Sequence, residues 1–149
     1  MYLDHCAQLS GGEVALARML GAMPEVEAVV VLAEDGPLVP RLEQVGAHVE
    51  VLELDPSVAG LRRGTVTGSG LGLGVLRRTF RHVGRLRRRL RTLHPDVVHT
   101  NSLKAALYGG VAGRLAGIPV VWHVRDRIAP DYLPRPAVLL VRVLAAVLP

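Results

Sequence analysis

Two neighbouring glycines near the N-terminus could bring a phosphate close to the backbone. Gly11 and Gly12 begin a predicted helix, whose free N–H groups and dipole favour an anion. Ser10 and Glu13 flank them with the Ser-x-x-Glu spacing of a capping box. A tight, capped turn explains the pair equally well, because the six-residue dinucleotide-binding fingerprint is missing here.

Further polar side chains follow a predicted strand in the second half of the chain. Asn101, Ser102 and Lys104 supply amide, hydroxyl and ammonium groups that suit hydrogen bonding to a polyol or a phosphate. Helix capping by Asn101 or Ser102, with a solvated Lys104, is an equally good interpretation, and both can hold together.

The segment Trp122–Asp126 is more polar than a strand end needs to be. Alternation along the strand places His123 and Arg125 on the same face. Arg125 could bind a phosphate or neutralise a leaving group, and His123 could donate a hydrogen bond or move a proton. The structural alternative is an ion pair of Arg125 with Asp126 or Asp131, and we favour the functional interpretation.

Short β-branched segments alternate with helical patterns, which predicts an α/β domain with an open, parallel, Rossmann-like sheet flanked by helices. In the usual strand order 3-2-1-4-5, the switch point lies between the first and fourth strands, and ligands bind there outside the carboxyl ends. The segment Ser10–Glu13 would then face Asn101–Lys104, with Arg125 and Asp126 beside them. We expect strands at 1–3, 26–33, 48–54, 96–100 and 119–124, and helices at 14–23, 37–45, 76–93, 103–116 and 137–148.

The positive charge of the chain is concentrated in one predicted amphipathic helix. The net charge is +5, yet the segment Arg77–Arg91 contains eight arginines and no acid. A solvated face is favoured over an anionic membrane surface, and nucleic acid comes last because stacking aromatics are scarce. The glycine-rich segment before this helix, Asp55–Gly74, predicts a mobile loop. The membrane patch would consist of Arg77, Arg78, Arg81, Arg85, Arg88 and Arg89.

The composition limits the number of domains and the kinds of disulfide, metal site and membrane segment that the chain can contain. The 149 residues, half of them apolar, suffice for one domain over residues 1–149 with an aliphatic core. The single cysteine, Cys6, excludes an intramolecular disulfide, and no Cys/His group has zinc-ligand spacing, so we expect neither a metal nor a cofactor. The sequence contains no recognisable signal peptide or membrane span, which predicts a cytoplasmic protein.

Three motifs occur in a familiar order: S-G-G-E, then P-D-V-V-H-T-N-S-L-K-A, then G-I-P-V-V-W-H-V-R-D. Together they resemble the N-terminal domain of family 4 glycosyltransferases, which are retaining enzymes of the GT-B fold. The resemblance implies an acceptor-side half whose partner half binds the nucleotide-sugar, with the reaction in the cleft between them. It places Gly11 and Gly12 near the donor phosphates. The catalytic candidates are His123, Arg125 and Asp126. The family has a histidine here that contacts the transferred sugar, and either His123 or Arg125 would occupy its position.

The sequence also departs from that family. The donor-site Glu-x7-Glu motif is absent, and the chain ends at Pro149, where the family enters its next strand. We therefore expect a truncated transferase that is inactive alone and needs a C-terminal donor domain or a separate subunit. Its partners would be a nucleotide-sugar and a glycan or lipid-linked envelope acceptor, at the inner face of the cell membrane.

Two other classes of function remain open. One is a non-catalytic module that docks on anionic membrane through the arginine-rich helix. The other, a dinucleotide-dependent oxidoreductase, is disfavoured because the fingerprint and an acidic ribose partner are missing.

Overall fold

A computed structural model describes residues 1–59, 72–125 and 127–149. Five parallel strands form one sheet with the order β3-β2-β1-β4-β5, which confirms the predicted order. The elements are β1 (Tyr2–Asp4), α1 (Gly11–Gly21), β2 (Val29–Leu32), α2 (Leu38–Glu43), β3 (His48–Val51), α3 (Pro56–Ala59), α4 (Leu73–Leu93), β4 (Val98–Thr100), α5 (Leu103–Ala116), β5 (Val120–Trp122) and α6 (Arg135–Val147).

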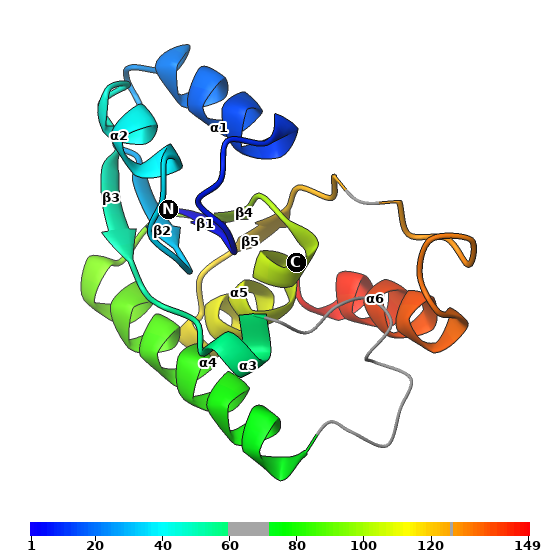
Figure 1. Ribbon diagram of the computed structural model, residues 1–149. Helices are drawn as coiled ribbons and strands as arrows, with labels where there is room; N and C mark the ends of the chain where they lie inside the picture. Colours follow the sequence, from blue (N-terminus) through cyan, green and yellow to red (C-terminus); the bar gives the residue numbers. More distant parts are fainter. Residues whose placement is uncertain (60–71, 126) are drawn as a thin grey trace.

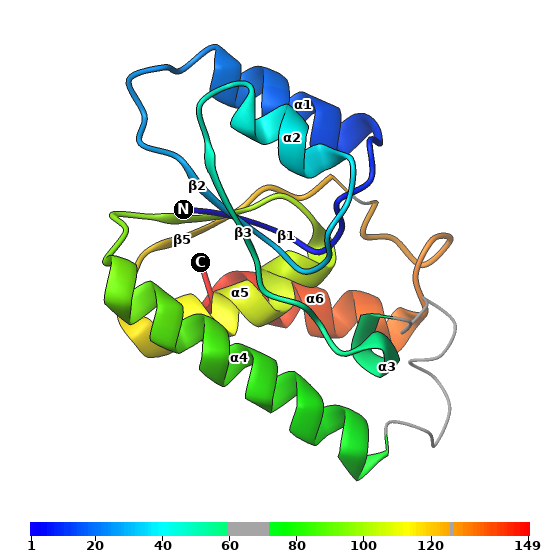
Figure 2. The ribbon, with the colours of Figure 1, turned by 60° about the vertical axis from the view of Figure 1, so that its left-hand side comes forward.

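Helices cover both faces of the sheet. Figures 1 and 2 show α1 and α2 on one face and α4, α5 and α6 on the other. The alternation of side chains along β2 accounts for these two layers: Val30 and Leu32 pack toward α1 and α2, whereas Val31 packs toward α4 and α5. Burial on both faces explains why β2 is apolar throughout.

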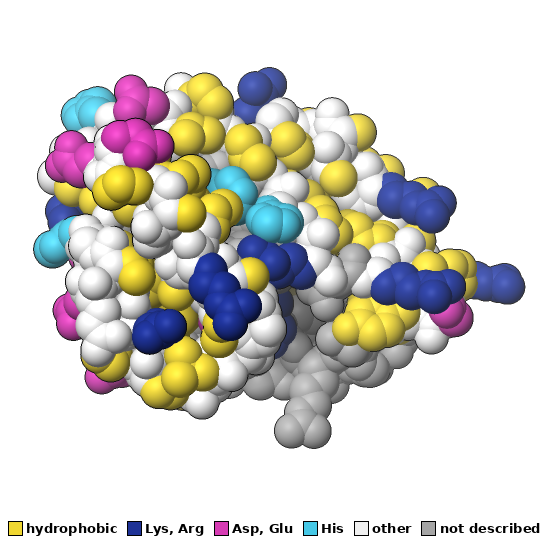
Figure 3. Space-filling view, turned by 90° about the horizontal axis from the view of Figure 1, so that it is seen from above, with side chains coloured by type: hydrophobic (Ala, Val, Ile, Leu, Met, Phe, Trp, Pro, Cys, Tyr) yellow, Lys and Arg dark blue, Asp and Glu magenta, His cyan; other side chains and the backbone are white. Residues whose placement is uncertain are grey.

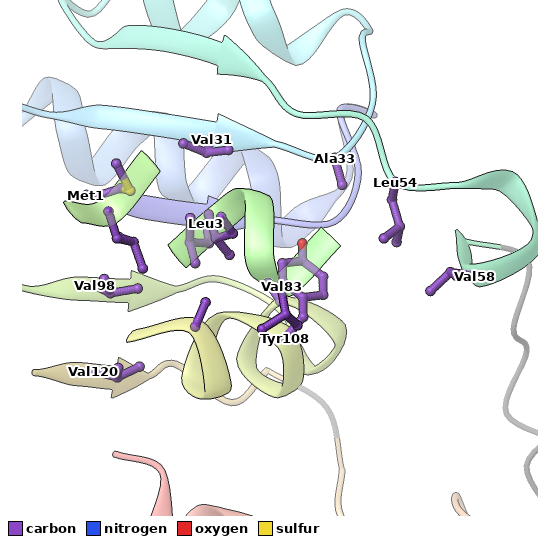
Figure 4. Packing of buried hydrophobic residues seen from close by; sticks show 14 residues of the cluster. Met1, Leu3, Val31, Ala33, Leu54, Val58, Val83, Val98, Tyr108 and Val120 are labelled. Carbon is purple, nitrogen blue, oxygen red and sulfur yellow. The ribbon is translucent and has the colours of Figure 1, made fainter. Parts of the chain in front are cut away.

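The larger core lies between the sheet and the α4–α5 layer. Figure 4 shows Leu3, Val98 and Val120, from three neighbouring strands, pointing toward the helices that carry Val83 and Tyr108. Aliphatic side chains dominate this cluster, as the scarcity of aromatic residues predicts.

Helix α5 lies close to the sheet because glycines line its inner face. A Cβ atom at Gly109 would lie 2.6 Å from Leu3 Cδ1, and one at Gly113 would collide with Val120 Cγ2. The helix ends at Gly117, whose φ of 77° is readily adopted by glycine.

Two glycine-to-alanine substitutions should change stability in opposite directions. We expect Gly109→Ala to lower the free energy of unfolding by about 1–3 kcal/mol, because buried Leu3 must move. At Gly84, inside α4, no described atom lies within 4 Å of a Cβ position. Gly84→Ala should therefore stabilise the protein by about 0.5–1 kcal/mol. Urea unfolding checks both values, and shifts of the same sign would contradict the packing described.

The predictions around α4 are partly wrong. The segment predicted as a loop, Asp55–Gly74, contains α3 and the first two residues of α4, and residues 60–71 of it lie outside the described residues. The helical spacing of Leu76, Phe80 and Val83 predicts that they share a buried stripe, but Leu76 is 41% exposed and Phe80 is 70% exposed. The reason is visible in Figure 2, where the N-terminal half of α4 extends past α5. The buried core residues of α4, Val83, Leu86 and Leu90, come from its C-terminal half, and Val75 alone packs against the core from the first turns.

The remaining predicted elements are found in order, with ends that differ by a few residues. None of the helices in the described part of the chain combines the length and apolar character needed to cross a membrane.

Candidate functional site

A buried amide joins β1, β4 and the start of α1 at the carboxyl edge of the sheet. Asn101, which follows β4, is 1% exposed, and Asp4, the last residue of β1, is fully buried. Asn101 Nδ2 donates to Asp4 Oδ2 at 2.5 Å and to the carbonyl oxygen of Gly12 at 3.4 Å. The predicted approach of the Ser10–Glu13 segment to the Asn101–Lys104 segment is therefore found at the switch point.

Arg125 completes this arrangement from the loop after β5. Its Nε donates to Asn101 Oδ1 at 3.0 Å. A Cβ atom at Gly12 would lie 3.1 Å from Arg125 Cδ, so the glycine leaves room for the arginine stem. We call this chain of contacts the Asp4–Asn101–Arg125 bridge, in which a buried carboxylate orients an exposed guanidinium through one amide.

Asp4 remains ionised although it is buried. Burial raises the pKa of Asp4, but hydrogen bonds from His5 and Asn101 outweigh burial and hold the pKa below its usual range. The backbone N–H of His5 donates to Asp4 Oδ1 at 2.7 Å. The sequence interpretation missed Asp4 and His5, although an acid at the end of the first strand adjoins the predicted switch point.

The hydroxyl of Ser102 caps α5, as one of the two interpretations predicted. Ser102 Oγ accepts from the N–H of Ala105 at 3.4 Å and lies 2.8 Å from His5 Nδ1. Lys104 is half-buried in the first turn of the same helix. Asn101 does not cap the helix but forms the bridge, so capping and site assembly are divided between two adjacent residues.

The capping box predicted at α1 is wrong in its details. Ser10 is the N-cap residue, but its hydroxyl donates to the buried Glu13 carboxylate rather than accepting a backbone N–H. Glu13 also accepts from Cys6 Sγ at 3.4 Å. Glu13 therefore ties the β1–α1 loop together, and the N–H groups of the first turn of α1 are left without a cap from Ser10.

Two histidines lie beside the guanidinium. His123 follows β5, and its ring meets that of His99 edge to face, with centroids 5.4 Å apart. Burial, together with Arg125, lowers the pKa of His123, and burial, His123 and Arg125 lower the pKa of His99. Both rings are therefore mainly neutral at pH 7, and each neutral ring can donate one hydrogen bond and accept another.

The predicted alternative for Arg125, an ion pair with Asp131, is wrong. Asp131 pairs with Arg127 at 2.9 Å and not with Arg125. Asp126, predicted as a catalytic residue or as the partner of Arg125, lies outside the described residues.

A sequence profile of the glycosyl transferase 4-like domain matches residues 10–148. The chain belongs to the glycosyltransferase 4-like family. No match is found among curated proteins. The family resemblance inferred from the three motifs is confirmed.

Solved structures with this fold include glycosyltransferases bound to nucleotides. Anabaena HepE in complex with UDP and glucose has a TM-score of 0.71 and 25% identity, over 97% of this chain and 34% of HepE. HepE in complex with UDP-glucose has a TM-score of 0.72 and 22% identity, over 99% and 34%. The lipopolysaccharide outer core galactosyltransferase WaaB, in its apo form, has a TM-score of 0.58 and 14% identity, over 94% and 36%.

This glycosyltransferase 4-like domain thus has the Rossmann-like fold found in one half of a GT-B enzyme. It spans about a third of the length of the structures that it matches.

One group of possible metal ligands exists within the described ranges. Ligand atoms of Asp4, His5 and Cys6 lie within 4.8 Å of one another. Asp4 and His5 are already hydrogen-bonded to Asn101 and Ser102. Burial, reinforced by the carboxylates of Glu13 and Asp4, raises the pKa of Cys6 to about 12. The thiol would have to lose its proton, and Asp4 and His5 their present hydrogen bonds, before the three groups could hold a metal ion.

The same pKa predicts an unreactive thiol. At pH 7 we expect Cys6 to react with iodoacetamide at least about a hundredfold more slowly than free cysteine, because the thiolate is the nucleophile. Glu13→Gln removes the neighbouring carboxylate and should speed the reaction several-fold. Mass spectrometry of alkylation time courses measures both rates. A rate equal to that of free cysteine would show that the thiol is not held in this way.

The arginine-rich helix α4 is not a uniform cationic patch. Arg89 forms a two-point pair with Glu50, which lowers the pKa of that carboxyl. Arg78 lies 3.4 Å from Asp55, and Arg85 Nη1 donates to the carbonyl oxygen of Glu53 at 3.4 Å. These three arginines hold α4 to β3 and the loop that follows it. Arg77, Arg81 and Arg88 of the predicted membrane patch are exposed.

The surface charge is unevenly distributed. On the face shown in Figure 3, Lys and Arg side chains lie across the centre and toward one end, and most of the visible acidic side chains lie at the other end. Histidine side chains gather beside the central basic group.

Proposed function

We propose that this chain is the acceptor-side half of a retaining glycosyltransferase that moves a sugar from a nucleotide-sugar to a glycan or lipid-linked envelope acceptor. The observation that carries the proposal is the Asp4–Asn101–Arg125 bridge, which holds a guanidinium over Gly12 at the switch point of the sheet. Guanidinium groups and helix N-termini both suit a diphosphate. The UDP and UDP-glucose bound by HepE support this ligand class.

Each side chain of the site has a role in the proposed reaction. Arg125 would stabilise negative charge that develops on the nucleoside diphosphate as the glycosidic bond to it breaks, without a metal ion or other cofactor. Neutral His123 would donate a hydrogen bond to the transferred sugar or move a proton. Ser10, Gly11, Gly12 and Glu13 would form the turn at the donor phosphates, Asn101, Ser102 and Lys104 would contact polar groups of the substrates, and Asp126 remains a catalytic candidate.

A second domain or subunit would supply the rest of the donor site. The chain spans about a third of the length of HepE and WaaB. Along α6, Leu139, Leu140 and Val143 are each at least half exposed. An exposed apolar face of this kind fits a surface that another part of the enzyme covers. We therefore propose that the chain alone does not transfer sugar.

The test compares this chain with the longer protein that we propose to contain it. Both would be incubated with nucleotide-sugars, and release of nucleotide would be followed by chromatography. We expect turnover in the longer protein alone, unchanged by EDTA, with the anomeric configuration retained in the product by NMR. A longer protein that binds no nucleotide-sugar would refute the proposal.

A second candidate function is docking on anionic membrane at the inner face of the cell membrane. It is favoured by the exposure of Leu73 (87%) and Phe80 (70%) at the first turns of α4. Arg77 lies between them at helical spacing, so apolar and basic side chains share one face. Such a face suits insertion of the apolar residues among anionic headgroups.

Phe80→Ser tests this docking function. We expect it to weaken co-sedimentation with phosphatidylglycerol vesicles about tenfold, because a buried Phe side chain contributes about 1.5–3 kcal/mol. Leu115→Ser, at a 55% exposed position on α5, is the matched control and should leave binding unchanged. Equal effects of the two variants would rule out insertion through α4.

A further inference from the structure

A basic pocket lies between α4 and the loop after β3, apart from the bridge described above. Its volume is about 280 Å³. Three guanidinium groups outnumber the two carboxylates in its lining, and a histidine lies among them. The lining residues that matter here are Glu53, Asp55, Arg78, Arg81, His82 and Arg85.

Helical spacing brings the three arginines to one face. Arg78, Arg81 and Arg85 occupy positions i, i+3 and i+7 of α4, so they lie on successive turns of the helix. The pocket therefore has one wall of guanidinium groups, facing the backbone of the β3–α3 loop.

Two of these arginines hold the loop: Arg85 donates to the carbonyl oxygen of Glu53, and Arg78 contacts Asp55 and Ser57. Arg78 Nε lies 3.4 Å from Asp55 Oδ2, and Arg78 Nη1 donates to Ser57 Oγ at 3.0 Å. Hydrogen bonds from Ser57, together with Arg78, hold the pKa of Asp55 below its usual range, so Asp55 and Arg78 balance each other at neutral pH. The positive charge that remains in the lining is carried by Arg81 and Arg85, and Glu53 opposes it in part.

His82 adds a buried polar atom that lacks a partner. The residue is 5% exposed, and its ring packs edge to face on Tyr108 with centroids 4.9 Å apart. Its Nδ1 is buried and has no hydrogen-bond partner among the described residues. That nitrogen is enclosed rather than open to the pocket, and the ring is hydrogen-bonded to the backbone of Glu53, so His82 is a fixed titratable group in the wall beside Arg85.

We propose that this pocket binds a phosphoryl group, presented as a phosphate monoester or a diphosphate. Arg81 and Arg85 would each make charge-assisted hydrogen bonds to phosphoryl oxygens, and the ring of His82 lies beside them in the wall of the pocket. The loop that forms one wall follows β3, so the pocket and the bridge lie at the same carboxyl edge of the sheet. A phosphorylated acceptor could thus be held here while its other end reaches Arg125, and this link to transfer rests on the proposed function.

The binding itself is tested on the 149-residue chain with sodium pyrophosphate at constant ionic strength. NMR of the histidine rings follows the titration. We expect a saturable shift of the His82 signals and a rise in the pKa of His82, because a bound anion favours the imidazolium form. The groups that face this ring are Arg78, Arg81 and Arg85 of α4, Glu53 and Asp55 of the loop, and Tyr108 of α5.

Two double variants with the same change in net charge distinguish a specific binding site from non-specific electrostatic attraction of the anion. Arg81→Gln with Arg85→Gln should weaken pyrophosphate binding at least about tenfold, because charge-assisted hydrogen bonds are lost. Arg91→Gln with Arg114→Gln alters two exposed arginines outside the pocket and should change the affinity by less than about twofold. All four positions are exposed, so both proteins should fold, and circular dichroism verifies this.

Three results would overturn the proposal: equal weakening by the two double variants, a shift of His82 that does not saturate, or saturable binding of glucose in place of pyrophosphate. Vesicles that contain phosphatidic acid then identify the source of the phosphoryl group. If the Arg81/Arg85 variant alone loses vesicle binding, the group is carried by a lipid. If that variant loses pyrophosphate but binds vesicles normally, the group belongs to a free ligand, and both results support the pocket. None of these measurements depends on transfer activity, so the pocket and the proposed function can fail separately.

Discussion

Replacing Asn101 by Asp should lower the free energy of unfolding at pH 7 by roughly 3 kcal/mol. The new carboxylate would lie against the buried carboxylate of Asp4, 2.5 Å from the present amide nitrogen. Arg125 would attract the new charge, but it is exposed and offsets only part of the repulsion. Urea unfolding measures the loss.

The pH dependence of this variant should be opposite in sign to that of the wild type. In the wild type the pKa of Asp4 is lowered by folding, so Asp4 stabilises the protein above its unfolded pKa of about 3.9, and this contribution is lost as pH falls through the folded pKa. In the variant, two carboxylates share one proton, which raises one folded pKa above its unfolded value. The destabilisation is therefore large at pH 7 and should shrink as pH falls to 5.

Asn101→Ala provides the control for lost hydrogen bonds. It removes one of the hydrogen bonds that hold the pKa of Asp4 down but adds no charge, so its destabilisation should shrink much less between pH 7 and pH 5 than that of Asn101→Asp. If the Asp and Ala variants lose equal stability at both values, then the charge of Asp4 has no role in holding the site.

The sequence was sufficient to predict the architecture because its signals are local and repeated. The limits of α5 were predicted correctly, since Ser102 caps its start and Gly117 ends it in the left-handed conformation. The alternation of strands and helices predicted a parallel sheet, and the usual strand order of such sheets is the one found. Helix α3 was missed because a four-residue helix has no periodicity to detect.

The site could be predicted only in outline. Topology placed Gly12, Asn101 and Arg125 in one crevice, and the structure brings them into contact. Asp4 was missed because β1 has three residues, too few for its pattern to show that the acid is buried. The hydroxyl–carboxylate contact of Ser10 with Glu13 could not be distinguished by spacing from a capping box.

The different environments of the arginines on α4 could not be predicted from the sequence either. Spacing indicates which arginines share a face, but it does not indicate what packs against that face. Arg89 meets Glu50 of β3, whereas Arg81 lines a pocket, and only the tertiary structure separates these environments. Treating the arginines of this helix as one surface, whether solvated or facing a membrane, could not separate these environments.

In the longer transferase that we propose, Arg125→Gln should lower kcat/KM about a hundredfold, as expected when a group that stabilises transition-state charge is removed. Because Arg125 is exposed, the free energy of unfolding of this chain should change by less than about 1 kcal/mol. Transfer rates and urea unfolding, measured on the same variant, separate the two effects. A loss of stability that matched the loss of rate would assign Arg125 a structural role instead.

Gly12→Val should also slow transfer, because it displaces the guanidinium of Arg125 from the side of α1. Its Cβ atom would lie 3.1 Å from Arg125 Cδ, and its methyl groups would push the arginine stem away from Asn101. Since both substitutions remove one interaction, the double variant should be no slower than the slower single variant. Gly84→Ala, remote in α4, should leave transfer unchanged. Additive losses in the double variant would mean that Gly12 and Arg125 serve separate functions, and that the close approach of backbone and guanidinium is incidental to catalysis.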